Sequence, residues 1–144
     1  LRGLVGSEMC IRDSINTVYD FMSDFRNLSK WAEGDDGELI TKEPLRLGSV
    51  FRVKTHFNNK PRVYDYEVVE WGPPLRVSLE AKASIFTIVD TIFLSANSKG
   101  TELTYSVNIK FKFPYFILSP FVSVLFNKVM DTQIKSLGEA LGET

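Results

Sequence analysis

The stretch INTVYDFMSDFRNLSKW, residues 15–31, determines how the chain folds near its start. Its apolar residues recur at three- and four-residue spacing, at Val18, Phe21, Met22, Phe25 and Leu28. This spacing places them on one face of an α-helix, and Ser14 or Asn16 can cap its N-terminus. We therefore expect a short amphipathic helix from residue 15 and a second helical turn at 27–31, which the glycine-bearing loop 33–37 ends.

Six segments after this loop have the composition of β-strands. They are rich in β-branched and aromatic residues, and clusters of Gly, Pro, Asn and Ser separate them. Six consecutive strands with short connections predict an antiparallel meander. The segments are 38–42, 49–58, 62–71, 75–81, 84–96 and 101–112.

The last of these segments alternates most regularly. Its apolar side chains share one face, which predicts a strand with one buried and one solvated side. The segments 62–71 and 84–96 are apolar on both faces and carry Tyr66 and Asp90 near their middles, so these two positions could border a cavity. The alternating apolar residues of 101–112 are Leu103, Tyr105, Val107, Ile109 and Phe111.

The residues after Pro114 have a helical stripe that continues to the end of the chain. A stripe of this length predicts a long amphipathic helix, and only the concave face of a sheet offers enough apolar surface to receive it. The expected fold class is α+β, with a curved antiparallel sheet of six to seven strands wrapped around a long C-terminal helix and two short helices near the N-terminus. The stripe consists of Leu118, Val122, Leu125, Val129, Met130, Ile134, Leu137 and Leu141.

The composition excludes several classes of partner. The 144 residues include 17 Lys and Arg against 18 Asp and Glu, and this formal net charge of −1 gives the chain as a whole no electrostatic attraction for nucleic acid or for anionic lipid headgroups. With one Cys and one His, the chain has no internal disulfide and no Cys or His metal cluster, so we expect no metal and no cofactor. The aromatic residues, 11 Phe, 5 Tyr and 2 Trp, indicate either a heavy core or an apolar cavity.

No segment has the pattern of a membrane span or a secretory signal. The longest apolar stretch, 113–126, is shorter than the ~20 residues a spanning helix needs and contains Pro114 and Pro120. The charged residues near the N-terminus interrupt any signal-like apolar run. We therefore expect a cytoplasmic protein without an integral membrane segment. Core packing is the favoured role of 113–126, with transient membrane contact as the alternative, and the oligomeric state is not predicted.

The order of elements and several local motifs resemble the START-like superfamily, also called SRPBCC. The opening helix 15–27 with Trp31 is similar to the family's first helix, and Gly48 to the glycine that opens its third strand. Residues 66–74 resemble its strand-then-proline turn, and 100–104 its Gly-Thr hairpin. The superfamily includes the polyketide cyclase and dehydrase family and the birch-pollen allergen fold. The resemblance covers residues 15–144 and implies a helix-grip fold with a hydrophobic cavity between sheet and helix.

Residues 1–14 depart from the family pattern. The family has a strand and an Ala-Pro-like pair before the first helix, whereas LVGSEMCIRDS, residues 4–14, resembles a translated linker found before unrelated reading frames in assembled environmental sequence. We hypothesise that residues 1–14 are not native and that the true first strand is missing, which would leave 101–112 as an exposed edge. Alternatively, residues 4–5 and 9–11 form an unusual first strand.

Few residues stand out as candidates for chemistry. Asp90 is in phase with the apolar residues of 84–96, so it either meets a partner, as in an ordinary ion pair, or has a raised pKa. The hydroxyls of Tyr64, Tyr66 and Tyr105 either orient a ligand or remain solvated while the rings pack. His56 is in phase with charged residues and indicates a solvated face, and Cys10 lies in the suspect segment.

The leading hypothesis is a domain that binds a lipid, isoprenoid or polyketide-like molecule in an internal cavity. Tyr66, Asp90 and Tyr105 are the expected ligand-binding residues, and no catalytic residue is assigned. The resemblance suggests a second hypothesis, a cyclase or dehydrase that uses acid–base catalysis in the same cavity. A third is a ligand-free interaction module associated with stress or chaperones.

Overall fold

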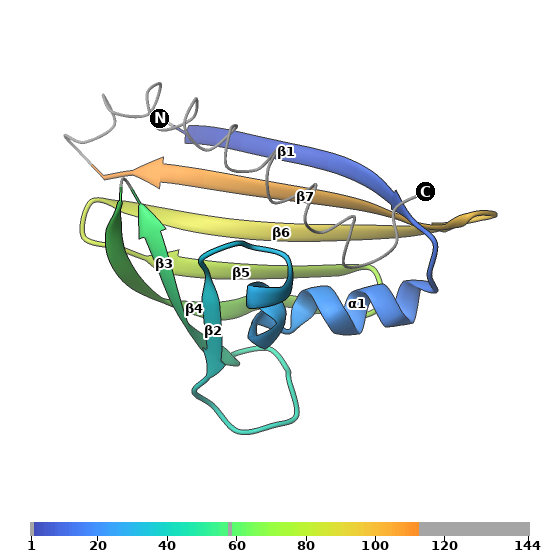
Figure 1. The fold of residues 1–144 in the computed structure, drawn as a ribbon, viewed down its shortest axis with the longest axis horizontal. Coiled ribbons are helices and arrows are strands. Elements are labelled where there is room, and N and C mark those ends of the chain that lie inside the picture. The colour runs from blue at the N-terminus through green and yellow to red at the C-terminus, as the bar shows by residue number, and fades with distance from the viewer. Residues whose placement is uncertain (1, 58, 113–144) are drawn as a thin grey trace.

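The computed structural model describes residues 2–57 and 59–112, which form one antiparallel sheet and two short helices (Figure 1). The predicted long helix after Pro114 lies outside the described residues. The six predicted strands and the two early helices are confirmed, with boundaries shifted by a few residues. In chain order the elements are β1 (Arg2–Ile11), α1 (Ile15–Ser23), the 3-10 helix η1 (Phe25–Lys30), β2 (Asp36–Leu39), β3 (Val50–Phe57), β4 (Lys60–Gly72), β5 (Arg76–Lys82), β6 (Phe86–Asn97) and β7 (Gly100–Phe111).

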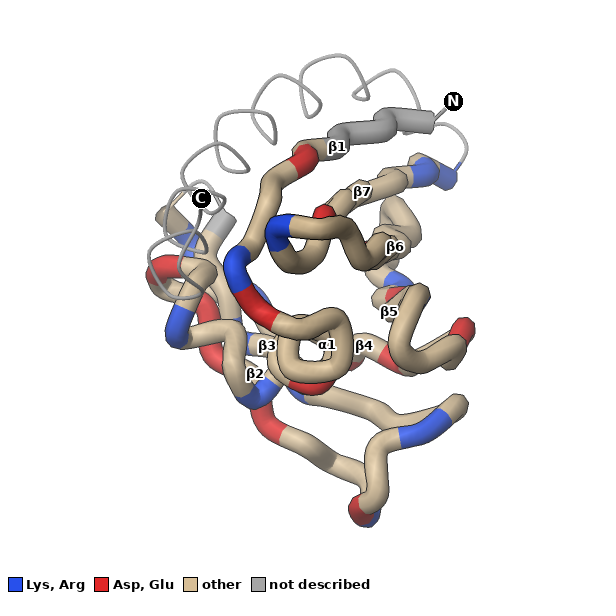
Figure 2. The backbone as a smooth tube through the Cα atoms, turned by 90° about the vertical axis from the view of Figure 1, so that its right-hand side faces the viewer, with Lys and Arg blue, Asp and Glu red and all other residues tan. Residues whose placement is uncertain are grey.

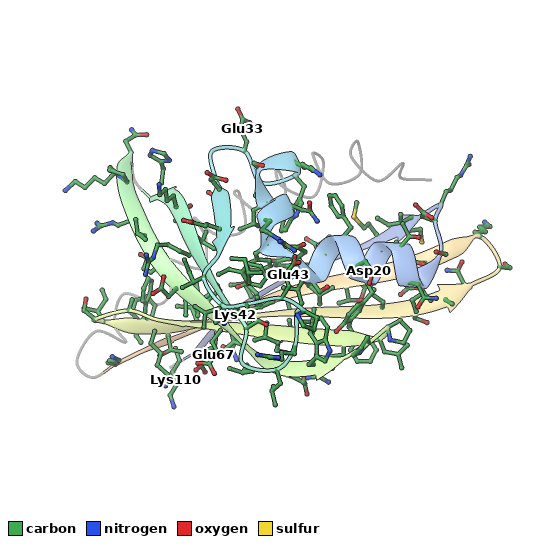
Figure 3. The ribbon with its side chains drawn as sticks, turned by 90° about the horizontal axis from the view of Figure 1, so that it is seen from below. Asp20, Glu33, Lys42, Glu43, Glu67 and Lys110 are labelled. Carbon is green, nitrogen blue, oxygen red and sulfur yellow. The ribbon has the colours of Figure 1, made fainter. Side chains whose placement is uncertain are left out.

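The seven strands form a single sheet in the order β1-β7-β6-β5-β4-β3-β2. Figure 2 shows that the sheet curves and that α1 lies within the curve. The opposite, convex face carries charged side chains, and Figure 3 shows Glu67 of β4 and Lys110 of β7 pointing to the side away from α1. The sheet therefore has an inner face on which the two short helices pack and an outer face that carries charged side chains.

Capping residues in the sequence explain where the two helices begin and end. The Ser14 side chain accepts a hydrogen bond from the Thr17 N–H, so Ser14 is the N-cap of α1. Asp24 ends this helix and caps η1, because its carboxylate accepts from the Arg26 N–H at 3.0 Å. The buried face of α1, which includes Val18 and Met22, packs toward β6 and β7.

Residues 2–11 form a strand that pairs with residues 101–110 of β7. The expected exposed edge at 101–112 is therefore corrected: β7 is an inner strand, and β1 and β2 are the two edges. Met9 and Ile11 of β1 are buried in the core. Backbone pairing needs donors and acceptors rather than a particular sequence, so a foreign segment can supply this strand as well as a native one. The foreign origin of residues 1–14 stays a prediction.

Two glycines allow close approaches that position the elements around the concave face. Gly100 has φ +142°, and a Cβ there would lie 2.1 Å from the Ile11 carbonyl oxygen. A Cβ at Gly37 would lie 1.9 Å from the carbonyl oxygen of Phe25. Because only hydrogen fits at Gly37, β2 can lie against η1 and hold Phe25 in the core.

The core lies between the concave face of the sheet and the two helices. In β7 the predicted alternation is confirmed, since the inward residues from Leu103 to Phe111 are buried while the outward residues are more exposed. Phe51, Val68, Leu79 and Ile92 continue the same layer across the neighbouring strands and are fully buried. The concave face is thus apolar except at a few positions.

Candidate functional site

The structure places the three predicted ligand-binding residues on the concave face. Tyr66 lies on β4, Asp90 on β6 and Tyr105 on β7, each in phase with the buried apolar residues of its strand. Their exposed fractions are 9%, 7% and 3%. Three polar side chains that are far apart in the sequence therefore lie within one largely apolar layer.

Strand register brings Asp90 and Tyr105 together. In the β6–β7 hairpin Asp90 is opposite Val107, and Tyr105 is opposite Ile92, so Asp90 and Tyr105 are diagonal neighbours on one face. The Tyr105 hydroxyl donates a hydrogen bond of 2.5 Å to Oδ2 of Asp90. Among the described residues the partner of Asp90 is therefore a phenol, and the ordinary ion pair stays a prediction.

Tyr66 approaches this pair from the other side of β5. Tyr66 is opposite Ala81 in β5, and the next inward residue of that strand, Leu79, is opposite Asp90. Within the described residues no hydrogen bond joins Tyr66 to Asp90 or Tyr105. The charge of Asp90 nevertheless contributes to a raised Tyr66 pKa, which indicates that the groups interact electrostatically.

Burial raises the pKa of Asp90 from an ordinary 3.8 to about 7. The hydrogen bond from Tyr105 opposes this rise, and the negative charge of Asp35 adds to it. A carboxyl with a pKa near 7 is present in both forms at neutral pH. It can therefore donate a hydrogen bond to a carbonyl oxygen as an acid or accept one from a hydroxyl as a carboxylate.

The two tyrosines remain protonated throughout the same pH range. Burial, with the nearby Asp90 charge as a further cause, raises the pKa of both Tyr66 and Tyr105 well above 10. Each phenol is therefore a hydrogen-bond donor, and Tyr105 donates to Asp90.

Aromatic residues from η1 and the following residue hold the tyrosine rings. Phe25 contacts Tyr66 edge-on with ring centroids 5.5 Å apart, and Trp31 contacts Tyr105 in the same way at 5.5 Å. The helical pattern of 15–31 predicts that Phe25 is buried, but the spacing does not show which ring it meets. These contacts restrict the orientation of both phenols.

Asp35 is the residue of this site that sequence reasoning missed. It lies just before β2, and its carboxylate accepts a hydrogen bond of 2.5 Å from the Thr55 hydroxyl. Burial raises its pKa, and its charge raises the pKa of Asp90, Tyr66 and Tyr105. In the sequence Asp35 lies in the polar loop 33–37, where no alternation of apolar residues marks a buried position. No signal therefore distinguishes it from its neighbours.

An open groove of about 1150 Å³ lies along the N-terminal half of β4, beside the β5–β6 connection. Its inner wall includes Tyr64, Phe86 and Phe111, whose rings follow one another at centroid distances of 6.1 and 5.7 Å. Tyr66, Asp90 and Tyr105 do not line this groove. That they border a cavity stays a prediction.

The other residues considered for chemistry lie outside this cluster. His56 is exposed, as its phase predicts, and Cys10 is exposed on the edge strand β1. Across residues 2–57 and 59–112, no three His, Cys, Asp or Glu side chains gather as metal ligands. Among the helices of this part of the chain, none is both long and apolar enough to cross a membrane. The cytoplasmic location stays a prediction.

The sequence matches a family model over most of its length. The model is described as polyketide cyclase / dehydrase and lipid transport, and it matches residues 9–142. The chain belongs to this family. The resemblance to the START-like superfamily is thereby confirmed. No curated protein matches the sequence.

Solved structures share the architecture of this polyketide cyclase / dehydrase and lipid transport chain. It is similar to a START superfamily protein from Mycobacterium smegmatis, with a TM-score of 0.80, 15% identity, and coverage of 96% of this chain and 97% of that chain. A protein of unknown function from Staphylococcus aureus matches with a TM-score of 0.76 and 13% identity, over 99% of this chain and 94% of that chain. At such identities the likeness shows the fold.

A two-domain protein also shares the fold. The di-domain ARO/CYC StfQ from the steffimycin biosynthetic pathway matches with a TM-score of 0.74 and 10% identity. The match covers 99% of this chain and 50% of StfQ, so this family member spans about half the length of that protein.

Proposed function

We propose that this chain binds a hydrophobic small molecule, of lipid, isoprenoid or polyketide type, against the concave face of the sheet. One observation carries the proposal: a hydrogen-bonded carboxyl and phenol, Asp90 and Tyr105, lie within an otherwise apolar layer. A fold gains little stability from such a pair, because burying a carboxyl is costly. Its position suits a polar anchor for a mostly apolar ligand.

We expect different groups to supply the affinity for the ligand and to fix its orientation. Apolar burial, at about 25 cal/mol per Å², supplies most of the binding free energy. Asp90 or Tyr66 then provides the hydrogen bond that fixes one oxygen of the ligand. Near neutral pH, protonated Asp90 suits a carbonyl oxygen and ionised Asp90 suits a hydroxyl, so the preferred ligand oxygen should change as pH passes through about 7.

The first experiment is native mass spectrometry of the full chain, with organic extraction of whatever apolar molecule copurifies. The proposal predicts a stoichiometric apolar ligand, and Asp90→Asn should lower its occupancy or change its identity. Thr91→Val is the matched control, because Thr91 is the next residue on β6 and faces the convex side. If Asp90→Asn changes neither ligand binding nor stability, Asp90 is not a site residue. A clean apo mass together with failure to bind added lipids or polyketides would favour a ligand-free interaction module.

A second candidate function is a cyclase or dehydrase, which the raised pKa of Asp90 favours. A general base or acid works best when its pKa lies near the operating pH, and the Asp90 pKa is about 7. In such a reaction Asp90 would take a proton from carbon beside a carbonyl, and the Tyr66 phenol would donate a hydrogen bond to the developing oxyanion. Loss of turnover in Asp90→Asn with ligand binding retained would support an enzyme over a carrier.

A further inference from the structure

The connection between β2 and β3, residues 40–49, projects below the sheet in Figure 1. We name it the 40–49 loop. Ile40 and Leu47 are 44% and 61% exposed, and Leu47 is the most exposed of the large hydrophobic side chains in the described part of the chain. By contrast, Leu45 of the same loop packs against the core. The loop therefore presents some aliphatic side chains to solvent while using another as an anchor.

Backbone hydrogen bonds hold Leu47 in this outward position. The Ser49 N–H donates to the Arg46 carbonyl at 3.1 Å, which closes a tight turn with Leu47 and Gly48 at its centre. Gly48 has φ +90°, as the third residue of a type II turn requires. The Gly48 N–H also donates to the Val68 carbonyl at 2.9 Å, which ties the turn to β4. The exposure of Leu47 is thus part of an ordered structure.

The charges on the 40–49 loop are predominantly positive. Its one acidic residue, Glu43, forms an ion pair of 2.7 Å with Arg26 of η1. Lys42 and Arg46 form no ion pair with any residue in the described ranges, and both are exposed. Figure 3 shows Lys42 and Glu43 on this loop. Two cations whose charge is not neutralised there accompany two exposed aliphatic side chains.

We propose that the 40–49 loop docks on the surface of an anionic lipid bilayer. Aliphatic side chains favour the boundary between headgroups and acyl chains, and each Lys or Arg near an anionic surface adds attraction. Two aliphatic residues with two cations give a weak and reversible contact, which suits collection and release of a membrane-derived ligand. Docking itself needs no ligand in the concave face, so the surface can be tested independently of the proposed function.

The test measures binding of the full chain to vesicles by co-sedimentation. Vesicles of pure phosphatidylcholine are compared with vesicles that contain phosphatidylserine, at low and high salt. The wild type should bind the anionic vesicles more tightly, with the preference lost at high salt. Leu47→Ser should weaken binding about tenfold. The double variant with Lys42→Gln and Arg46→Gln should weaken binding to anionic vesicles about thirtyfold and remove the preference for them.

Leu75→Ser is the matched control, because Leu75 is a leucine of similar exposure, 52%, in the β4–β5 connection. It should leave vesicle binding unchanged. Circular dichroism confirms that each variant is folded. Three results would overturn the proposal: no binding by the wild type, equal loss in Leu75→Ser and Leu47→Ser, or an anionic preference that survives removal of both cations. Each of these leaves a ligand in the concave face unaffected, so failure here is distinguishable from failure of the proposed function.

Discussion

A carboxyl group on the convex face of the sheet has a different environment from one on the concave face. On the convex face Glu70 accepts hydrogen bonds from Arg76 Nε at 2.5 Å and from the Ser78 hydroxyl at 3.0 Å, and water reaches its side chain. On the concave face Asp90 is 7% exposed, and its partner within the described residues is the neutral phenol of Tyr105. Glu70 lies on β4 and Asp90 on β6 of the same sheet, yet among the described residues a cation lies beside Glu70 and none beside Asp90.

The difference shows what a polar group contributes in each setting. An exposed ion pair in water is worth little to stability, so Glu70 and Arg76 can be read as solvated surface. A buried carboxyl without a cation opposes folding whenever it is ionised. The Asp90 arrangement therefore adds little to stability, as the proposed ligand-binding role of Asp90 requires. Three predictions test this contrast.

The largest effect concerns the pH dependence of stability. The folded protein raises the Asp90 pKa from 3.8 to about 7, so between these values the native state holds a proton that the unfolded state releases. Stability must therefore fall as pH rises through this window, by about 4 kcal/mol in total, and level off above pH 7. The raised pKa of Asp35 acts in the same direction. Urea titrations from pH 4 to 8 measure the fall.

Asp90→Asn should remove most of this fall, since the amide does not ionise. The variant should then be more stable than the wild type at pH 8 and nearly equal to it at pH 4. Glu70→Gln is the control on the convex face and should keep the wild-type pH profile. If the free energy of unfolding of the wild type does not change between pH 4 and 7, folding does not raise the pKa of Asp90.

Most of the fold can be predicted from the sequence because its signals are local. The alternation in β7 has a period of two, which by itself identifies the strand and its buried face. Ser14 and Asp24 can be recognised as caps from their chemistry. Asp90 can be found because a charged residue in phase with apolar ones is unusual. None of these inferences requires knowing which segments meet.

The contacts of the site depend on register and tertiary packing, which local patterns do not contain. Asp90 meets Tyr105 because the β6–β7 hairpin pairs Asn97 with Gly100. The turn cluster 97–100 is visible in the sequence, but a shift of one residue would separate the two side chains. Asp35 reaches the site because Gly37 lets β2 approach η1, and no sequence pattern reports that approach. The sequence of residues 1–14 leaves open whether a first strand is missing or forms in an unusual way, because strand pairing is a property of the backbone.

A second prediction tests whether Tyr105 stabilises the buried carboxyl. Tyr105→Phe removes the donor and leaves the ring, so the protein should lose about 1–3 kcal/mol of stability at neutral pH. The Asp90 pKa should also rise further, because the hydrogen bond from Tyr105 lowers it. Ser78→Ala on the convex face is the control and should cost about 1 kcal/mol or less, since its acceptor Glu70 keeps the hydrogen bond from Arg76. Carboxyl-carbon NMR titration and urea unfolding measure both quantities.

The smallest effect is expected from the convex ion pair. A double-mutant cycle with Glu70→Gln and Arg76→Gln should give an interaction free energy of about 0.2–1 kcal/mol that decreases at high salt. Arg76 also lies over the Phe93 ring, 5.6 Å from its centroid. Loss of this contact costs the same with or without Glu70, so it cancels in the interaction free energy. A coupling of several kcal/mol would mean that the convex face is as dehydrated as the concave one. Glu70 and Asp90 would then be equally dehydrated, and among the described residues they would differ only in their partners, a guanidinium for Glu70 and a phenol for Asp90.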